Sequence, residues 1–499
     1  MFKTFAFKIY IVALVLRLIP VILARGLGIG LDDMFQYDML ARSLASGHGF
    51  RWYAEADLNQ LASFVTFDLT SVKDYDPSLG IPTSFRAPLY PSFLAIVYFF
   101  NGTDFSRFFA ARMAQAIFLG APLAPFTYFV AQRLFPLSSF DDEERRKRRP
   151  EVLEGTKENA ARISAWLVAA YPMLLVYPLG LGTENPFFSL LLASFFFLLK
   201  FQERPSNLNS LISGSLLGLT GLTRSVILPF AGLAILWTWF SLKQTRGAIL
   251  MAIAFTFTIT PWIIRNSRLH NKLTGIETSM GYNLYLGYHL KGNGSFVFGP
   301  SLDLLTILDD AERDKIGTQK ALEFIKAQPK RFIPLAINRL GFFFGLEKRV
   351  LMYFYGNDIL GFVPLPLLLT ISIILLLPFV IISTSAALGL SLLRWNPQTC
   401  LLALLLVSYL LPHVFILSED RFHLALVPYI AILAAQFWVN GFGALSARWR
   451  ESQTGKILVI LAVLCVFLLV TNWGFELTRD ADKISQLLSP TGNQSYFPY

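Results

Sequence analysis

The sequence predicts an all-α protein that crosses a membrane many times. Of its 499 residues, 54% are hydrophobic and only 15% are charged, whereas soluble domains carry about 25% charged residues. Several apolar runs approach the roughly 20 residues that a helix needs to cross a bilayer core. The formal charge of +10 does not indicate nucleic-acid binding, because the basic residues cluster between apolar runs, as cytoplasmic loops require.

The first apolar run extends from about Ile9 to Gly30 and follows Lys3 and Lys8. It is long for a signal peptide and has no clear small-residue cleavage site, so we expect a signal anchor with a cytoplasmic N-terminus. Cys400 and Cys465 lie inside other apolar runs, and no disulfide framework is therefore expected.

The densest basic run, DDEERRKRRP at residues 141–150, sets the orientation because such runs remain in the cytoplasm. This orientation requires that the apolar piece at 88–100 does not cross the membrane. That piece has about 13 residues, a length typical of an interfacial or re-entrant segment. We therefore expect it at the outer interface, inside a first external region of about residues 31–107.

About eleven spans then alternate across the membrane, within a single transmembrane domain of residues 1–475. The first four cover about 9–30, 108–135, 163–181 and 186–199. The fifth and sixth end at 223–224 and 243. The seventh and eighth cover about 248–264 and 362–392, and the last three end near 418, 447 and 477. A second external region spans about 266–358, and the tail, 476–499, is also external. We expect RFIPLAINRLGFFFGLEKR, at 331–349, to be interfacial; a short extra span there is the alternative.

Several charges lie at external span ends, where the positive-inside rule gives no reason for arginine. The arginines are Arg86, Arg224, Arg265, Arg268 and Arg421; the carboxylates are Asp32, Asp33 and Glu184, with Glu419 and Asp420 as further candidates. Each alone could be a solvated interface charge or part of an ion pair. Together they favour a site, because the planar fork of arginine suits phosphate and a carboxylate suits proton abstraction.

The stretch after the acidic doublet fits such a site. If a helix starts at Asp33, Tyr37 lies one turn on, on the same face. Gly47 and Gly49 would end the helix with turn residues. His48 between them is a candidate site residue, although a lone histidine in a turn is more often solvated. No Cys/His metal spacing, phosphate-binding glycine loop or Ser/His/Asp signature occurs, and the LTGLTRS glycine is better explained by helix packing.

Eight motifs follow one another in an order that resembles a known superfamily. They are DDMFQYDMLARSLASGHGF at Asp32, FRAPLYPSFLA at Phe85, RMAQAIFLGAPLAPFTYFVAQRLF at Arg112, YPLGLGTENPF at Tyr177, GLTRSVILPF at Gly221, TPWIIRNSRLHNKLTGIETSMGYNLYLG at Thr260, ALEFIKAQPKRF at Ala321 and SEDRFHLALVPY at Ser418. The order resembles the GT-C membrane glycosyltransferases, particularly the family 39-like bacterial relatives of protein O-mannosyltransferases and of the lipid A aminoarabinose transferase.

The resemblance implies a GT-C fold with two large extracytoplasmic loops that carry interfacial helices. It also implies inverting transfer of a sugar from a polyprenyl-phosphate donor, and it assigns roles to residues in the matching motifs. Asp33, four before Tyr37, matches the general base, with Asp32 as the alternative within the doublet. Glu184, with Tyr37, would orient the acceptor, or Glu184 would hold a divalent metal ion. The resemblance also implies that the donor phosphate is bound by four arginines, Arg86, Arg224, Arg265 and Arg421.

The family pattern of an Asp-Glu pair and a later HPP is replaced here by Asp32-Asp33 and APL, so a protein acceptor is not implied. The acceptor, a glycan, lipid or protein, stays open, and the implied location is a bacterial plasma membrane with the site outside. Two alternatives remain. A transporter or flippase of lipid-linked sugars would place ionisable residues near the bilayer midplane and often shows inverted repeats; an oligosaccharide ligase or polymerase would share the fold.

Overall fold

The computed structural model describes residues 4–72, 75–135, 150–348, 351 and 363–489. Within these residues, eight helices are long and apolar enough to cross a membrane, or nine if one bent pair is a single span. The eight are α1 (Phe5–Leu23), α5 to α6 (Arg107–Leu134), α10 (Glu184–Glu203), α13 (Thr245–His270), α19 (Leu365–Leu390), α20 (Pro397–Phe415), the 3-10 helix η7 with α21 (Asp420–Glu451), and α22 (Gln453–Arg479). The chain is therefore a helical, multi-pass membrane protein, as the sequence predicts.

A helix stands at each of the eleven predicted spans. The third span is the bent pair α8 (Pro150–Ala170) and α9 (Pro172–Val176), whose axes differ by 52°. The fifth and sixth are α11 (Asn207–Gly221), with 15 residues, and α12 (Leu228–Phe240), with 13. These two are shorter than a full crossing, so the count of eleven stays a prediction. The basic run at 141–149 and the end of the tail, 490–499, lie outside the described residues.

The break between α8 and α9 has a local cause and a local compensation. Pro172 has no N–H group, which leaves the carbonyl of Val168 without its helical donor. The Arg17 guanidinium of α1 donates to Val168 O at 3.1 Å and to Ala169 O at 3.2 Å. Arg17 is completely buried, and a buried charge is tolerated in a span when it satisfies backbone carbonyls in this way. Arg17 thus braces the bend.

Glycines allow α11 and α13 to pack closely. A Cβ atom on Gly214 would lie 2.2 Å from the Met251 carbonyl oxygen, and one on Gly218 would lie 2.7 Å from Thr258 Cβ. A Cβ atom on Gly221, the glycine of LTGLTRS, would lie 3.1 Å from Leu228 Cδ2 of α12. Small residues at such contacts let helix backbones approach in a membrane, which confirms the predicted packing role.

Two regions, about 31–107 and 266–358, are named the first and second external regions after the prediction made for them above. The first contains α2 (Asp33–Ala45), α3 (Glu55–Leu61), α4 (Leu89–Asn101) and a two-stranded antiparallel ribbon. The ribbon pairs β1 (Arg51–Trp52) with β2 (Ile81–Pro82), Arg51 opposite Pro82 and Trp52 opposite Ile81. As predicted, α4 is too short to span a membrane by length. It buries Tyr90, Leu94 and Tyr98 but exposes Ile96, Phe99 and Phe100, an apolar face suited to an interface.

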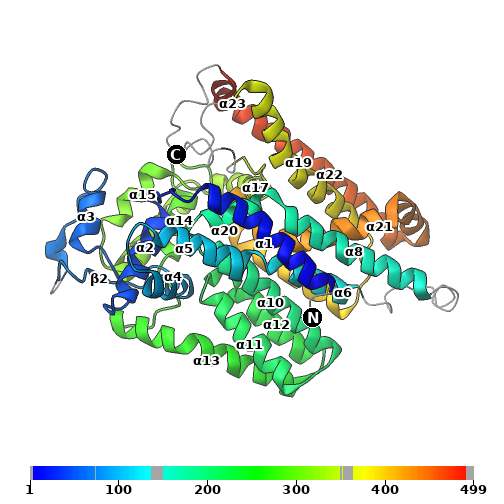
Figure 1. Cartoon of the computed structure of the whole chain (residues 1–499), viewed down its shortest axis with the longest axis horizontal. Coiled ribbons are helices and arrows are strands. Elements are labelled where there is room, and N and C mark those ends of the chain that lie inside the picture. Colours follow the sequence, from blue (N-terminus) through cyan, green and yellow to red (C-terminus); the bar gives the residue numbers. More distant parts are fainter. Residues whose placement is uncertain (1–3, 73–74, 136–149, 349–350, 352–362, 490–499) are drawn as a thin grey trace.

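The second external region contains α14 (Met280–Tyr288), α15 (Phe298–Leu305), α16 (Asp310–Ala327) and α17 (Phe332–Phe343). Hydrogen bonds from Thr83 and Ser84 to Asp310 join the two regions. In Figure 1 both lie at one end of the molecule, α2 to α4 in blue and α14 to α15 in green, whereas α19, α21 and α22 lie toward the other side. Helix α23 (Ala481–Leu488) follows α22.

Buried ion pairs fix α2 against its surroundings. Asp38 is only 1% exposed and accepts hydrogen bonds from Arg42 at 2.8 Å, Arg107 at 2.8 Å and Tyr98 at 2.9 Å. Arg42 also reaches Asp57 at 2.6 Å. Because a buried carboxylate is costly unless it is fully paired, this set of contacts makes the orientation of α2 specific.

Candidate active site

The structure gives the two aspartates of the doublet different tasks. Asp32 is the N-cap of α2, and its side chain accepts from the Met34 N–H at 2.8 Å. Asp33 is the first residue of the helix, and its carboxylate turns to the arginines described below. Helix α2 ends at Ala45, followed by Gly47 and Gly49 with positive φ, as predicted. The exposed His48 between them lies on the surface of the turn.

Asp33 is held by two arginines from distant parts of the chain. Its Oδ1 accepts from Arg86, in the loop after β2, and its Oδ2 lies 3.4 Å from Nη2 of Arg421, in η7. The Asp33 side chain is 38% exposed, which leaves it accessible to a ligand. The N-terminal helix, the first external region and the last third of the chain therefore meet at this carboxylate.

Glu184 forms the second half of the site. It is the first residue of α10, and its Oε1 lies 2.8 Å from Nη1 of Arg224 and 3.7 Å from Nη1 of Arg421. Glu419 contacts Nε of Arg421 at 3.0 Å. Because Arg421 reaches Asp33, Glu184 and Glu419, it links the two carboxylates that the sequence predicts at the site.

The charges around Asp33 control its acidity. Burial raises the pKa of its carboxyl group, but the nearby guanidinium groups of Arg86, Arg421 and Arg224 outweigh burial and lower the pKa to about 2. For Asp32, burial and the charge of Asp33 raise the pKa above its ordinary value. The two neighbouring carboxyl groups are thus pushed in opposite directions, which separates their chemistry.

Tyr37 is buried and packs against the guanidinium group of Arg86. It is 4% exposed, and burial raises the pKa of its phenol to about 12. The Arg86 guanidinium lies over the Tyr37 ring, 5.2 Å from its centroid, and the ring meets Tyr90 edge-on at 5.2 Å. These contacts support Arg86 by a cation–π interaction.

Arg265 is the predicted residue that the structure does not bring to this cluster. Its guanidinium donates to the backbone carbonyls of Thr83 and Phe50 and to the side chain of Asn266. In the described part of the chain Arg265 forms no ion pair. The structure thus gives Arg265 a role in holding the backbone of residues 50 and 83, and its contact with the donor phosphate stays a prediction.

Three further residues of the site were not predicted from the sequence. Gln36 Oε1 accepts from Arg86 Nε at 2.8 Å and Nη2 at 2.6 Å. Glu277 accepts from the backbone N–H and hydroxyl of Ser225, and its charge raises the pKa of Arg86. Tyr282 lies close enough to Asp33 for that charge to raise its phenol pKa. Glu277 had one available signal, because it is the only carboxylate in the motif that begins at Thr260.

The residues do not fit a divalent metal ion. No group of three or more His, Cys, Asp or Glu side chains with suitable geometry occurs in the ranges that the structure covers. Asp33 and Glu184, the two carboxylates predicted for such a role, are each paired with guanidinium groups. A divalent cation between them would meet three positive charges, whereas hard cations need several free oxygen ligands. An anion suits this donor set better.

Comparison with known proteins finds similarity among solved structures. No protein-family model matches the chain, and no curated protein matches it. Among solved structures, the chain is similar to ArnT from Cupriavidus metallidurans bound to undecaprenyl phosphate, with 13% identity over 89% of this chain and 79% of that chain and a TM-score of 0.35.

Proposed function

We propose that the chain is an inverting membrane glycosyltransferase that moves a monosaccharide from a polyprenyl-phosphate donor to an acceptor hydroxyl at the extracytoplasmic face. The observation that carries the proposal is the meeting of Arg86, Arg224 and Arg421 with Asp33 and Glu184 at one place. Planar guanidinium groups suit a phosphate, and a partly exposed carboxylate beside them suits the acceptor hydroxyl. The sequence motifs support the same assignment.

Without ligand, the guanidinium groups of the cluster are already paired with carboxylates. Arg86, Arg224 and Arg421 form ion pairs with Asp33, Glu184 and Glu419. A donor phosphate must therefore compete with the carboxylates for guanidinium donors. When the phosphate takes donors from Arg86 and Arg421, Asp33 loses much of the positive field that lowers its pKa and gains a negative neighbour. Donor binding would thus make Asp33 a stronger base.

The transfer then follows as a single displacement. The Asp33 carboxylate accepts the proton of the acceptor hydroxyl, whose oxygen forms a bond to the anomeric carbon of the sugar. The bond from that carbon to the phosphate oxygen breaks, and its electron pair leaves with the polyprenyl phosphate. The arginines stabilise the charge that develops on the phosphate. Attack opposite the leaving group inverts the anomeric configuration. Glu184, paired with Arg224 and close to Arg421, keeps these two arginines in place in this scheme.

A flippase is the competing function. Among the residues that the structure describes, the buried arginines within the spans are Arg17 and Arg112. Both donate to backbone carbonyls, Arg17 to Val168 and Ala169, and Arg112 to Leu179 and Gly28. Such contacts brace helices and loops and do not provide a polar path for a headgroup. The ionisable cluster instead lies at the ends of α10 and η7, which favours the enzyme.

The donor site is tested by measuring the affinity of the purified chain for undecaprenyl phosphate. We expect Arg86→Gln, Arg224→Gln and Arg421→Gln each to weaken binding about 10-fold or more, because a hydrogen bond to a charged group contributes about 1.5–3 kcal/mol. Arg268→Gln is the matched control. Arg268 is an exposed arginine in the last turn of α13, so this variant should bind like the wild type. Wild-type affinity in all three site variants would contradict the proposal.

A further inference from the structure

The three residues before Arg86 are almost completely buried and held from several directions. Thr83 and Ser84 are 0% exposed and Phe85 is 1% exposed. Thr83 N donates to Phe50 O, Ser84 N to Asp310, Phe85 N to Thr83 Oγ1, while Ser84 O accepts from Thr278 N and Thr83 O from Arg265. The backbone that delivers Arg86 to the site is therefore fixed before the side chain begins.

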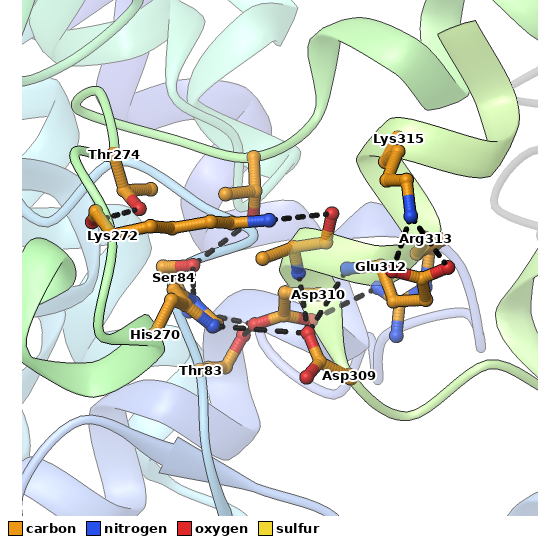
Figure 2. A network of polar contacts seen from close by, with 12 residues as sticks. Thr83, Ser84, His270, Lys272, Thr274, Asp309, Asp310, Glu312, Arg313 and Lys315 are labelled. Carbon is orange, nitrogen blue, oxygen red and sulfur yellow. Dashed lines mark hydrogen bonds and ion pairs between the residues drawn. The ribbon is translucent and has the colours of Figure 1, made fainter. Parts of the chain in front are cut away.

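Asp310 is the centre of this arrangement, as Figure 2 shows. It is the first residue of α16 and only 2% exposed. Its Oδ2 accepts from the Thr83 hydroxyl at 2.6 Å and from Ser84 N–H at 2.7 Å, and its Oδ1 lies 3.1 Å from Nη1 of the fully buried Arg313. One carboxylate of the second external region thus clamps the segment of the first region that carries Arg86.

Next to Asp310, a serine, a histidine and an aspartate lie in the order of a catalytic triad, but the serine is not accessible to a substrate. Ser84 Oγ lies 2.7 Å from His270 Nε2, and His270 Nδ1 lies 3.7 Å from Asp309 Oδ1. Ser84 is fully buried, and its hydroxyl also lies 3.0 Å from the Thr278 hydroxyl. A substrate carbonyl has no route to this oxygen, so these residues serve as further anchors of the segment.

Phe85 links the fixed backbone of residues 83–85 to the side chain of Arg86. Its ring lies 5.5 Å from the rings of Trp52 and Tyr282, and 4.9 Å from the Arg313 guanidinium. The Arg86 guanidinium then lies 5.1 Å from the Phe85 ring centroid. A small shift of the backbone at residues 83–85 would therefore move Arg86 relative to Asp33, and misplacement by about 1 Å is enough to impair a reacting site.

We infer that Asp310 is a positioning residue, which fixes Arg86 for the donor phosphate by holding the backbone of Thr83 and Ser84. The inference rests on the proposed function and adds to it a dependence on the second external region. It gives that region a defined task, because α16 is packed against α14 and its first residue holds the segment that carries Arg86.

The test is a double-mutant cycle on undecaprenyl phosphate affinity in the purified full-length chain. Asp310→Asn keeps the shape but removes the negative charge, so the ion pair with Arg313 is lost and the hydrogen bonds from Thr83 and Ser84 go to a weaker, neutral acceptor. We expect about 5- to 10-fold weaker binding in Asp310→Asn and a smaller loss in Thr83→Val, which removes one donor to Asp310. In the Arg86→Gln background, Asp310→Asn should cause no further loss. Thr83→Val serves as the second variant if Asp310→Asn fails to fold.

Glu312→Ala is the matched control. Glu312 also lies in the first turn of α16, but its carboxylate pairs with Lys315 at 3.4 Å and does not hold Thr83 or Ser84, so this variant should keep wild-type affinity. Wild-type affinity in both Asp310→Asn and Thr83→Val, or a loss that adds fully to that of Arg86→Gln, would overturn the inference while the donor site stands. Wild-type affinity in Arg86→Gln itself would instead remove Arg86 from the donor site, and the inference with it.

Discussion

At the scale of residues, the two adjacent carboxylates of the doublet acquire different properties from their surroundings. Asp32 accepts from a backbone N–H at the start of α2, and Asp33 faces Arg86 and Arg421. The spacing to Tyr37 favoured Asp33 in the sequence, but spacing alone could not show that Asp32 is a helix cap. Likewise Arg265 shared its position at an external span end with Arg224, and only folding shows that Arg265 holds backbone carbonyls.

The lowered pKa of Asp33 predicts how the stability of the ligand-free protein depends on pH. The folded-state pKa of about 2 lies below the ordinary value of 3.8, so Asp33 stabilises the fold above about pH 4, and this contribution disappears as the pH falls toward 2. The melting temperatures of wild type and Asp33→Asn should therefore differ by a constant amount between pH 7 and about pH 5 and converge below about pH 4. Convergence between pH 7 and pH 6 would contradict the ion-paired state of Asp33.

At the scale of elements, the sequence predicts most of the helices, because apolar runs and their polar ends are visible without contacts. It predicts the start of α2 and the short length of α4 correctly. The bend between α8 and α9 was missed, since it depends on Pro172 together with Arg17 from another helix. The ribbon β1–β2 was also missed, because two-residue strands give no periodic pattern.

The contact between α11 and α13 gives a prediction about stability. Gly214→Ala would place a Cβ atom 2.2 Å from the Met251 carbonyl, so the helices must separate, at a cost of about 1–3 kcal/mol. Gly232→Ala in α12 is the matched control, because a Cβ atom there meets nothing within 4 Å and alanine favours the helix. Thermal unfolding in detergent should show a loss for the first variant alone. Equal stability of the two variants would exclude close packing at Gly214.

At the scale of the whole molecule, residues far apart in the sequence converge at one cluster of charges. The positive-inside rule grouped Arg86, Arg224 and Arg421 with Asp33 and Glu184, and the structure brings these five together. The clamp of Asp310 on Thr83 and Ser84 could not be predicted from sequence, since it depends on how two external regions dock.

The orientation of the chain can be tested by cysteine labelling in intact cells, after Cys400 and Cys465 are replaced. Ser295→Cys, in the second external region, should react with a membrane-impermeant maleimide, because we place that region outside. Lys243→Cys, in the exposed turn after α12, should react only after the membrane is permeabilised. The reverse pattern would place the arginine cluster in the cytoplasm.

The most direct test of the central claim is the lipid-linked sugar pool of cells in which the wild-type chain is replaced by Asp33→Asn. Mass spectrometry of the lipid extract should show accumulation of a polyprenyl-phosphate monosaccharide, since the base is lost while the arginines remain to bind the donor. Asp32→Asn should not cause this accumulation, because asparagine also caps a helix. An unchanged lipid profile in Asp33→Asn cells, with the variant present in the membrane at wild-type levels, would contradict the account.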